Sequence, residues 1–315
     1  MTQAPLDPQM KMVLDMAAAS GRPKMWTLAP AEAREMYRQT ARILDLKPAP
    51  AVAEIVNRKL PGAAGELPTR LYRPQGAAAG DLLVFFHGGG YTIGDLETHD
   101  VPCRILATRA NVAVLAIDYR LAPEHKFPAG VDDAVAVLRW VRANAASLGA
   151  SPDRVAVGGD SAGGNLSTVA CLRLRDAGEA LPLFQLLIYP GTDFAADYES
   201  RRLFREGYFL EEKSMDYFRA HYISDADRLN ALASPLRAKD LGGLPPAHVF
   251  TAAFDPLRDE GKAYADKMAA AGVKTSYRCV DGLVHGFLHF TGAVKAADVA
   301  MTDIAAAIRN GFGRS

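Results

Sequence analysis

The sequence has 315 residues, of which 49% are hydrophobic and 23% are charged. A chain of this length and composition can bury a large core, which favours one α/β domain with an appendage over several small domains. Its 36 basic and 36 acidic residues cancel, so no overall field steers the protein towards nucleic acid or an anionic membrane. We therefore expect the partner to be an uncharged or modestly charged small molecule.

Cysteine usage and the first residues bear on location. Cys103, Cys171 and Cys279 stand singly, which provides neither a disulfide framework nor the paired spacing of a zinc site. We therefore predict no metal and a cytoplasmic location. The first sixteen residues contain Asp7 and Asp15 and lack the basic start and apolar run of a signal peptide. We therefore do not expect a signal peptide here. No apolar stretch approaches the length of a transmembrane helix, so no stable membrane insertion is expected.

Residues 1–50 are predicted to form two helices that serve as a cap. Apolar side chains recur at helical spacing before and after a break at Gly21 and Pro23. They are Met10, Val13, Leu14 and Ala17, then Met36, Tyr37, Thr40, Ala41 and Leu44. Residues 51–315 are predicted to form the main domain, which opens with a hairpin around a turn at Pro61–Gly65.

From Leu82 onward, short apolar runs alternate with helical patterns, which is typical of a parallel sheet covered by helices. The runs are LLVFF, VAVLAI, RVAVGG, FQLLIY, AHVFTAAF and SYRCV. Helices are predicted around 131–141 and 294–308. Residues from about 192 to 230 are richer in charged and aromatic side chains and lack a clear strand, so we interpret them as an insertion that contributes to the cap.

The strongest chemical signal is the segment GDSAG at 159–163, which directly follows an apolar run and precedes a helical stretch. A G-x-S-x-G pattern between a strand and a helix is typical of a nucleophile elbow. In such a turn, small neighbours tolerate a strained serine whose hydroxyl points outward near the positive end of the helix. We predict that Ser161 is the nucleophile. The alternative is a glycine-rich βα turn with a serine that caps the helix.

A second signal is His87-Gly88-Gly89-Gly90, which directly follows LLVFF. Glycine N–H groups can approach a substrate oxygen without interference from a Cβ atom. We predict that Gly88, Gly89 and the N–H of Ala162 form an oxyanion hole. The alternative is a loop whose glycines serve only its turn geometry. His87 is interpreted as a structural hydrogen-bonding residue.

A serine hydroxyl becomes a good nucleophile when an imidazole removes its proton, and an acid holds that imidazole in place. The expected chain order is serine, acid, histidine. His285 is the predicted base, because it alone among the later histidines lies in a glycine-flanked loop after a strand. Asp255 is the predicted acid, because it ends the strand AHVFTAAF and precedes Pro256.

Other titratable residues near these motifs receive structural interpretations. His289 follows four residues after the predicted base and is interpreted as a surface or packing residue. His248 begins a predicted core strand, and His221 lies in the insertion. Asp259 and Glu260 are interpreted as carboxylates at the start of a helix. Asp160 is expected to point away from Ser161 and to hold the elbow together.

Taken together, these segments resemble the hormone-sensitive-lipase-like family of bacterial esterases. The matching pieces are HGGGY, DYRLAPEHKFPA, GDSAGGNL, DPLRDE and HGF, which occur in this order between about Leu71 and Phe287. The resemblance implies an α/β-hydrolase fold with an eight-stranded, mostly parallel sheet and a mainly N-terminal helical cap. It also implies a loop at Asp118–Glu124 that is tied by an Arg–Glu pair and supports the elbow.

The same resemblance implies a function. The protein would hydrolyse short-chain acyl esters through an acyl-enzyme intermediate, without a cofactor, with Ser161, Asp255 and His285 as its triad and Gly88, Gly89 and Ala162 as oxyanion donors. Two copies would pair as a homodimer through an edge strand or the C-terminal helix.

Alternatives to an esterase remain at this point. The same groups could cleave an aryl amide or act as a lipase on long-chain lipid. Met10, Met12, Met16, Met25 and Met36 are interpreted as cap core, with an adaptable acyl pocket as a second possibility. A non-catalytic receptor on this fold is a different class, which the presence of His285 disfavours.

Overall fold

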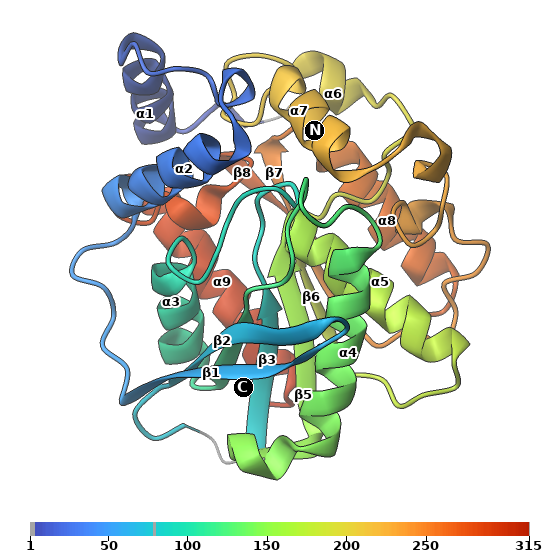
Figure 1. The fold of residues 1–315 in the computed structure, drawn as a ribbon. Helices are drawn as coiled ribbons and strands as arrows, with labels where there is room; N and C mark the ends of the chain where they lie inside the picture. The colour runs from blue at the N-terminus through green and yellow to red at the C-terminus, as the bar shows by residue number, and fades with distance from the viewer. Residues whose placement is uncertain (1–3, 78–79, 315) are drawn as a thin grey trace.

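The computed structural model describes residues 4–77 and 80–314, and over these ranges it contains one eight-stranded sheet (Figure 1). The strands are β1 (Glu54–Gly62), β2 (Gly65–Arg73), β3 (Gly80–Phe86), β4 (Ala113–Ile117), β5 (Ala150–Asp160), β6 (Gln185–Ile188), β7 (Ala247–Phe254) and β8 (Thr275–Val284). They lie in the order β1-β2-β4-β3-β5-β6-β7-β8. Strand β2 is antiparallel to β1 and β4, and the other neighbours are parallel. The predicted hairpin and mostly parallel sheet are confirmed.

Helices separate most of the strands, as the alternating pattern predicts. In the described ranges they are α1 (Pro8–Ala19), α2 (Pro30–Leu44), α3 (Asp100–Ala110), α4 (Ala129–Ala143), α5 (Ala162–Asp176), α6 (Glu199–Leu203), α7 (Glu212–Tyr222), α8 (Arg258–Ala270) and α9 (Lys295–Gly311). Helix α3 was not predicted, although its buried residues Cys103, Leu106, Ala107 and Ala110 have helical spacing. None of these helices has the length and apolar character needed to cross a membrane.

The core consists of two layers, one on each face of the sheet. Alternation along β3 divides its side chains between them: Leu82, Val84 and Phe86 pack on the face covered by α4, α5 and α8, whereas Leu83 and Phe85 pack on the face covered by α3 and α9. Every residue of β3 is buried. Continuous burial of a central parallel strand explains why LLVFF is apolar without interruption.

Helices α1, α2, α6 and α7 lie at the same end of the molecule, which is the top in Figure 1. The first two come from residues 1–50, and the other two come from the insertion at about residues 192–230. Each of the four contributes side chains to one cavity that also reaches Ser161. Segments far apart in the sequence therefore enclose the same space.

Arg34 is one of the side chains that attach helix α2 to the main domain. Its guanidinium donates to the backbone oxygens of Thr92 and Ala122, at 2.9 Å each, and pairs with Glu124 at 2.6 Å. The hydrogen bond from Arg34 lowers the pKa of Glu124 to about 2. A charged donor thus bridges the cap and two loops beside the sheet.

The expected Arg–Glu tie within Asp118–Glu124 is wrong. Arg120 instead pairs with Asp133 of α4, whose carboxylate is fully buried 2.8 Å from the Arg120 Nε atom. Glu124 is more exposed and is reached by Arg34 from the cap. The sequence motif was recognised correctly, but its charged partners lie outside the segment, where sequence spacing offers no guide.

The Arg34 contacts predict that the cap becomes less firmly attached when this side chain loses its charge but keeps most of its length. We expect Arg34→Met to lower the free energy of unfolding by about 2 kcal/mol, because two carbonyl oxygens lose a charged donor. Limited proteolysis within residues 1–50 should also become faster. Arg42→Met, an exposed change on the same helix, is the matched control. Equal proteolysis rates for both variants and the wild type would contradict this role.

Candidate active site

Ser161 lies at the turn between β5 and α5 with φ 52° and ψ −115°. A residue with a side chain in such a conformation costs about 1–3 kcal/mol and persists only where its surroundings enforce it. Here the Ser161 N–H donates to the Ile188 oxygen at 2.8 Å, which ties the turn to the neighbouring strand β6. The hydroxyl is held out from the sheet at the N-terminus of α5, as the sequence predicts for an elbow.

Two glycines allow this turn to pack against the end of β3. A Cβ atom added to either Gly159 or Gly163 would lie less than 3.0 Å from the backbone oxygen of Phe86. No larger residue fits there without a backbone shift. Because Phe86 directly precedes the glycine-rich loop at 87–90, the same close contact places that loop beside Ser161.

His285 and Asp255 complete a chain of hydrogen bonds with the serine. His285 directly follows β8, and its Nε2 atom lies 2.9 Å from Ser161 Oγ. Its Nδ1 atom lies 2.7 Å from Asp255 Oδ2. Asp255 follows β7 and is fully buried, and its other oxygen accepts the N–H of Leu257 at 2.8 Å. The three residues that the sequence singled out therefore meet in the order that an activated serine needs.

The alternative acids and bases have other partners. Asp259 and Glu260 lie in the first turn of α8, as predicted, and Asp259 accepts from Arg258 and from the Ser200 N–H. Glu260 is buried and pairs with Arg201. His221 contacts a carbonyl oxygen of its own helix, and His248 contacts Ser276. None of these groups reaches Ser161.

The glycine-rich loop differs in one respect from the prediction. The N–H of Gly88 donates to Asp160 Oδ1 at 2.7 Å, so it is already used and is not available to a substrate oxygen. Gly89, Gly90 and Ala162 border the cavity, and Gly88 does not. In the part of the chain that the structure describes, the N–H groups of these three residues donate to no protein acceptor. The loop geometry thus replaces Gly88 by Gly90 as a candidate donor.

His87 has the structural character that the sequence suggested. Its ring stacks on Tyr119 with centroids 4.4 Å apart, and its Nδ1 atom lies 2.8 Å from the Gly88 oxygen. Burial, aided by the nearby His99, lowers the pKa of His87 to about 4. The ring is therefore neutral near neutral pH, and Nδ1 donates to Gly88 and steadies the loop.

The cavity above Ser161 has a volume of about 800 Å³ and is lined largely by apolar side chains from the cap. Met16, Met25 and Met36 are among them. Met10 is fully buried, whereas Met12 and Met16 are 62% and 67% exposed. The interpretation of the methionines as cap core therefore holds only for Met10. Three others border the pocket, where a flexible thioether can adapt to different ligands.

The lowered pKa of His87 predicts how stability depends on pH. Its ordinary pKa is 6.5 and its value in the folded protein is about 4. Between these values the unfolded chain binds a proton that the folded chain excludes, so the free energy of unfolding should fall by about 3 kcal/mol as the pH falls through this window. His87→Asn keeps a donor and cannot titrate, so its urea-unfolding free energy should vary less over the window. His125→Asn, at an exposed site, should behave like the wild type. Parallel curves for all three proteins would contradict the assignment.

Comparisons with known proteins agree with this geometry. Residues 83–289 match a family described as alpha/beta hydrolase fold. The chain is 45% identical over 280 residues to carboxylic ester hydrolase LipN of Mycobacterium tuberculosis, covering 86% of this chain and 74% of that protein. It is 39% identical over 248 residues to ethyl acetate hydrolase of Pseudomonas putida, covering 77% and 78%. An ester hydrolase from the metagenome of Lake Arreo matches its structure with a TM-score of 0.94 and 46% identity, covering 98% and 99% of the two chains. The chain therefore belongs to the hormone-sensitive-lipase-like carboxylesterases of the α/β-hydrolase superfamily.

Proposed function

We propose that this protein hydrolyses short-chain acyl esters with Ser161 as nucleophile, His285 as general base and Asp255 as the acid that orients the histidine. The observation that carries the proposal is the imidazole of His285, which lies within hydrogen-bond distance of both partners. Nδ1 donates to the buried Asp255 carboxylate, which leaves Nε2 free to accept the serine proton. A single ring thus has the tautomer that the reaction needs.

The reaction proceeds in two similar halves. Ser161 Oγ attacks the ester carbonyl carbon while His285 takes its proton, and a tetrahedral intermediate forms. His285 then protonates the departing alkoxide, the alcohol leaves, and the acyl group remains on Ser161. Water, deprotonated by His285, attacks this acyl-enzyme and releases the carboxylic acid. Asp255 stabilises the imidazolium in both halves without accepting its proton.

The oxyanion that develops in each half is assigned to the N–H groups of Gly89, Gly90 and Ala162. All three residues border the cavity beside Ser161. Ala162 is also the first residue of α5, so its N–H points from the positive end of the helix dipole. Preorganised donors of this kind stabilise negative charge in the transition state more than in the substrate.

Two further assignments are proposed for the protein as a whole. A cytoplasmic location is supported by Cys103, Cys171 and Cys279, which all carry free thiols, two of them buried. A homodimer is supported by the resemblance to the family. The ester itself is proposed to be small, as the name of the Pseudomonas putida relative suggests for that enzyme.

The nucleophile assignment predicts the effect of removing one oxygen atom. Ser161→Ala should lower kcat by about 10³-fold or more, because the covalent step is lost while the binding groups remain. A phosphonate that labels serine covalently should modify the wild type at Ser161 and leave this variant unmodified. Ser147→Ala, at an exposed site, should retain full activity and labelling. A wild-type protein that binds esters but is never labelled would be a receptor, and that result would refute the proposal.

Substrate length separates an esterase from its enzymatic rivals. Rates on p-nitrophenyl esters of increasing acyl length should be highest for short chains, because the cavity above Ser161 has a volume of about 800 Å³, which suits a small ester. The matching anilides should be cleaved far more slowly, because an amide carbonyl is less electrophilic than an ester carbonyl and an amine is a poorer leaving group than a phenol. A maximum at long chains in emulsion would favour a lipase, and comparable anilide rates would favour an amidase.

A further inference from the structure

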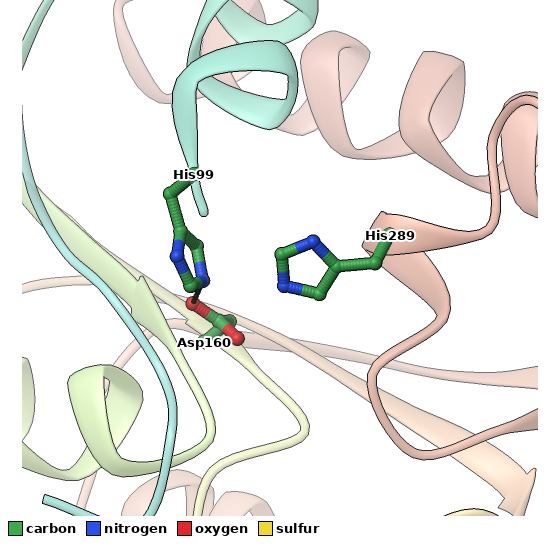
Figure 2. Close-up of side chains that lie close together, drawn as sticks. All are labelled: His99, Asp160 and His289. Atoms are coloured by element: carbon green, nitrogen blue, oxygen red, sulfur yellow. Dashed lines mark ion pairs between the residues drawn. The ribbon is translucent and has the colours of Figure 1, made fainter. Parts of the chain in front are cut away.

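A buried polar cluster lies beside the elbow and includes Asp160, the residue before Ser161. It consists of His99, Asp160 and His289, which we call the His–Asp cluster (Figure 2). The three side chains come from the start of α3, the end of β5 and the segment after β8. Each is at most 2% exposed, and one nitrogen or oxygen atom from each lies within 4.8 Å of the others. The triad makes no use of them.

Asp160 connects this cluster to the glycine-rich loop. Its Oδ1 atom accepts the Gly88 N–H at 2.7 Å and lies 3.1 Å from His99 Nε2, the pair joined by the dashed line in Figure 2. Burial alone would raise the pKa of Asp160, but the His99 ring and the Gly88 N–H bring it below its ordinary value. The acceptor is therefore a carboxylate anion. A Cβ atom on Gly88 would lie less than 3.0 Å from this carboxylate, so only glycine allows the contact.

The cluster also reaches the cap. Tyr37 of α2 places its hydroxyl 2.7 Å from His289 Nε2. The His289 ring packs edge-on against the His99 ring, with centroids 4.7 Å apart. Burial lowers the pKa of His289, so the ring is neutral and its Nε2 atom can accept a hydrogen bond from the Tyr37 hydroxyl. Contacts thus run without a gap from a cap helix to the N–H that fixes the loop.

We propose that Tyr37 is a positioning residue for the oxyanion hole, acting through His289 and His99 on the Asp160 carboxylate that holds the Gly88 N–H. This inference rests on the proposed function. Gly88 directly precedes Gly89 and Gly90, so a shift of its peptide moves both donors. Displacements of about 1 Å at such a site can cost 10²-fold in rate. The cap therefore helps to set transition-state stabilisation as well as enclosing the substrate.

Tyr37→Phe removes only the hydroxyl that contacts His289 and keeps the ring that packs in the cap. After active-site titration, we expect Tyr37→Phe to lower kcat by about 3- to 10-fold with KM unchanged, less than the 10²–10³-fold lost when a donor itself is removed. The inhibition constant of a boronic acid, whose tetrahedral adduct places an oxygen in the hole, should rise by the same factor. A loss that appears only in KM, or a boronate affinity that stays at the wild-type value, would overturn the proposal.

A matched control and a double-mutant cycle isolate the path of this effect. Tyr217→Phe removes a buried hydroxyl that has no hydrogen-bond partner in the described chain, and it should leave kcat and boronate affinity unchanged. His289→Gln should lower kcat like Tyr37→Phe, and the double variant should be no worse than the poorer single variant. Should His289→Gln fail to fold, His99→Gln replaces it in the cycle.

Additive losses in the cycle would mean that Tyr37 acts by another route and would overturn the proposal. The proposal would also be overturned if a chelator abolished the activity of the wild type and Zn²⁺ restored it. The His–Asp cluster would then be a metal site. A failure of either kind leaves the proposed function intact, since that depends on Ser161 and its covalent labelling.

Discussion

The active site depends on one close contact, between the backbone oxygen of Phe86 at the end of β3 and the turn that begins α5. Gly159 and Gly163 permit it, because a Cβ atom at either position would overlap with that oxygen. The contact has two effects at once. It forces Ser161 into a left-handed backbone conformation, and it brings the loop that follows β3 within reach of the same substrate oxygen. One packing contact therefore contributes to the position of both the nucleophile and the oxyanion donors.

Two consecutive residues of this turn have different partners. Ser161 meets His285 in the cavity, whereas the carboxylate of Asp160 accepts the Gly88 N–H. The strained turn lets two neighbouring residues, the reactive Ser161 and the structural Asp160, contact different groups. The stabilising hydrogen bond lies next to the strained residue, where it offsets part of the cost of that conformation.

The sheet, the hairpin and the residues Ser161, Asp255 and His285 could be predicted, because strand periodicity and local motifs carry that information. Features that depend on contacts between distant segments could not. The choice between Gly88 and Gly90 is decided by Asp160, 72 residues further along the chain. Arg120 and Glu124 lie within one motif but have partners outside it.

The two N-terminal helices are attached with different strength. Helix α2 is fixed to the main domain through Arg34, whereas α1 buries only Met10 completely and leaves Met16 largely in solvent. Yet Met16 borders the cavity above Ser161. Substitutions along this part of α1 can alter the shape of the pocket at small cost in folding free energy. Substrate range is therefore free to diverge by point mutation on the face of α1 that borders the cavity, away from the core residue Met10.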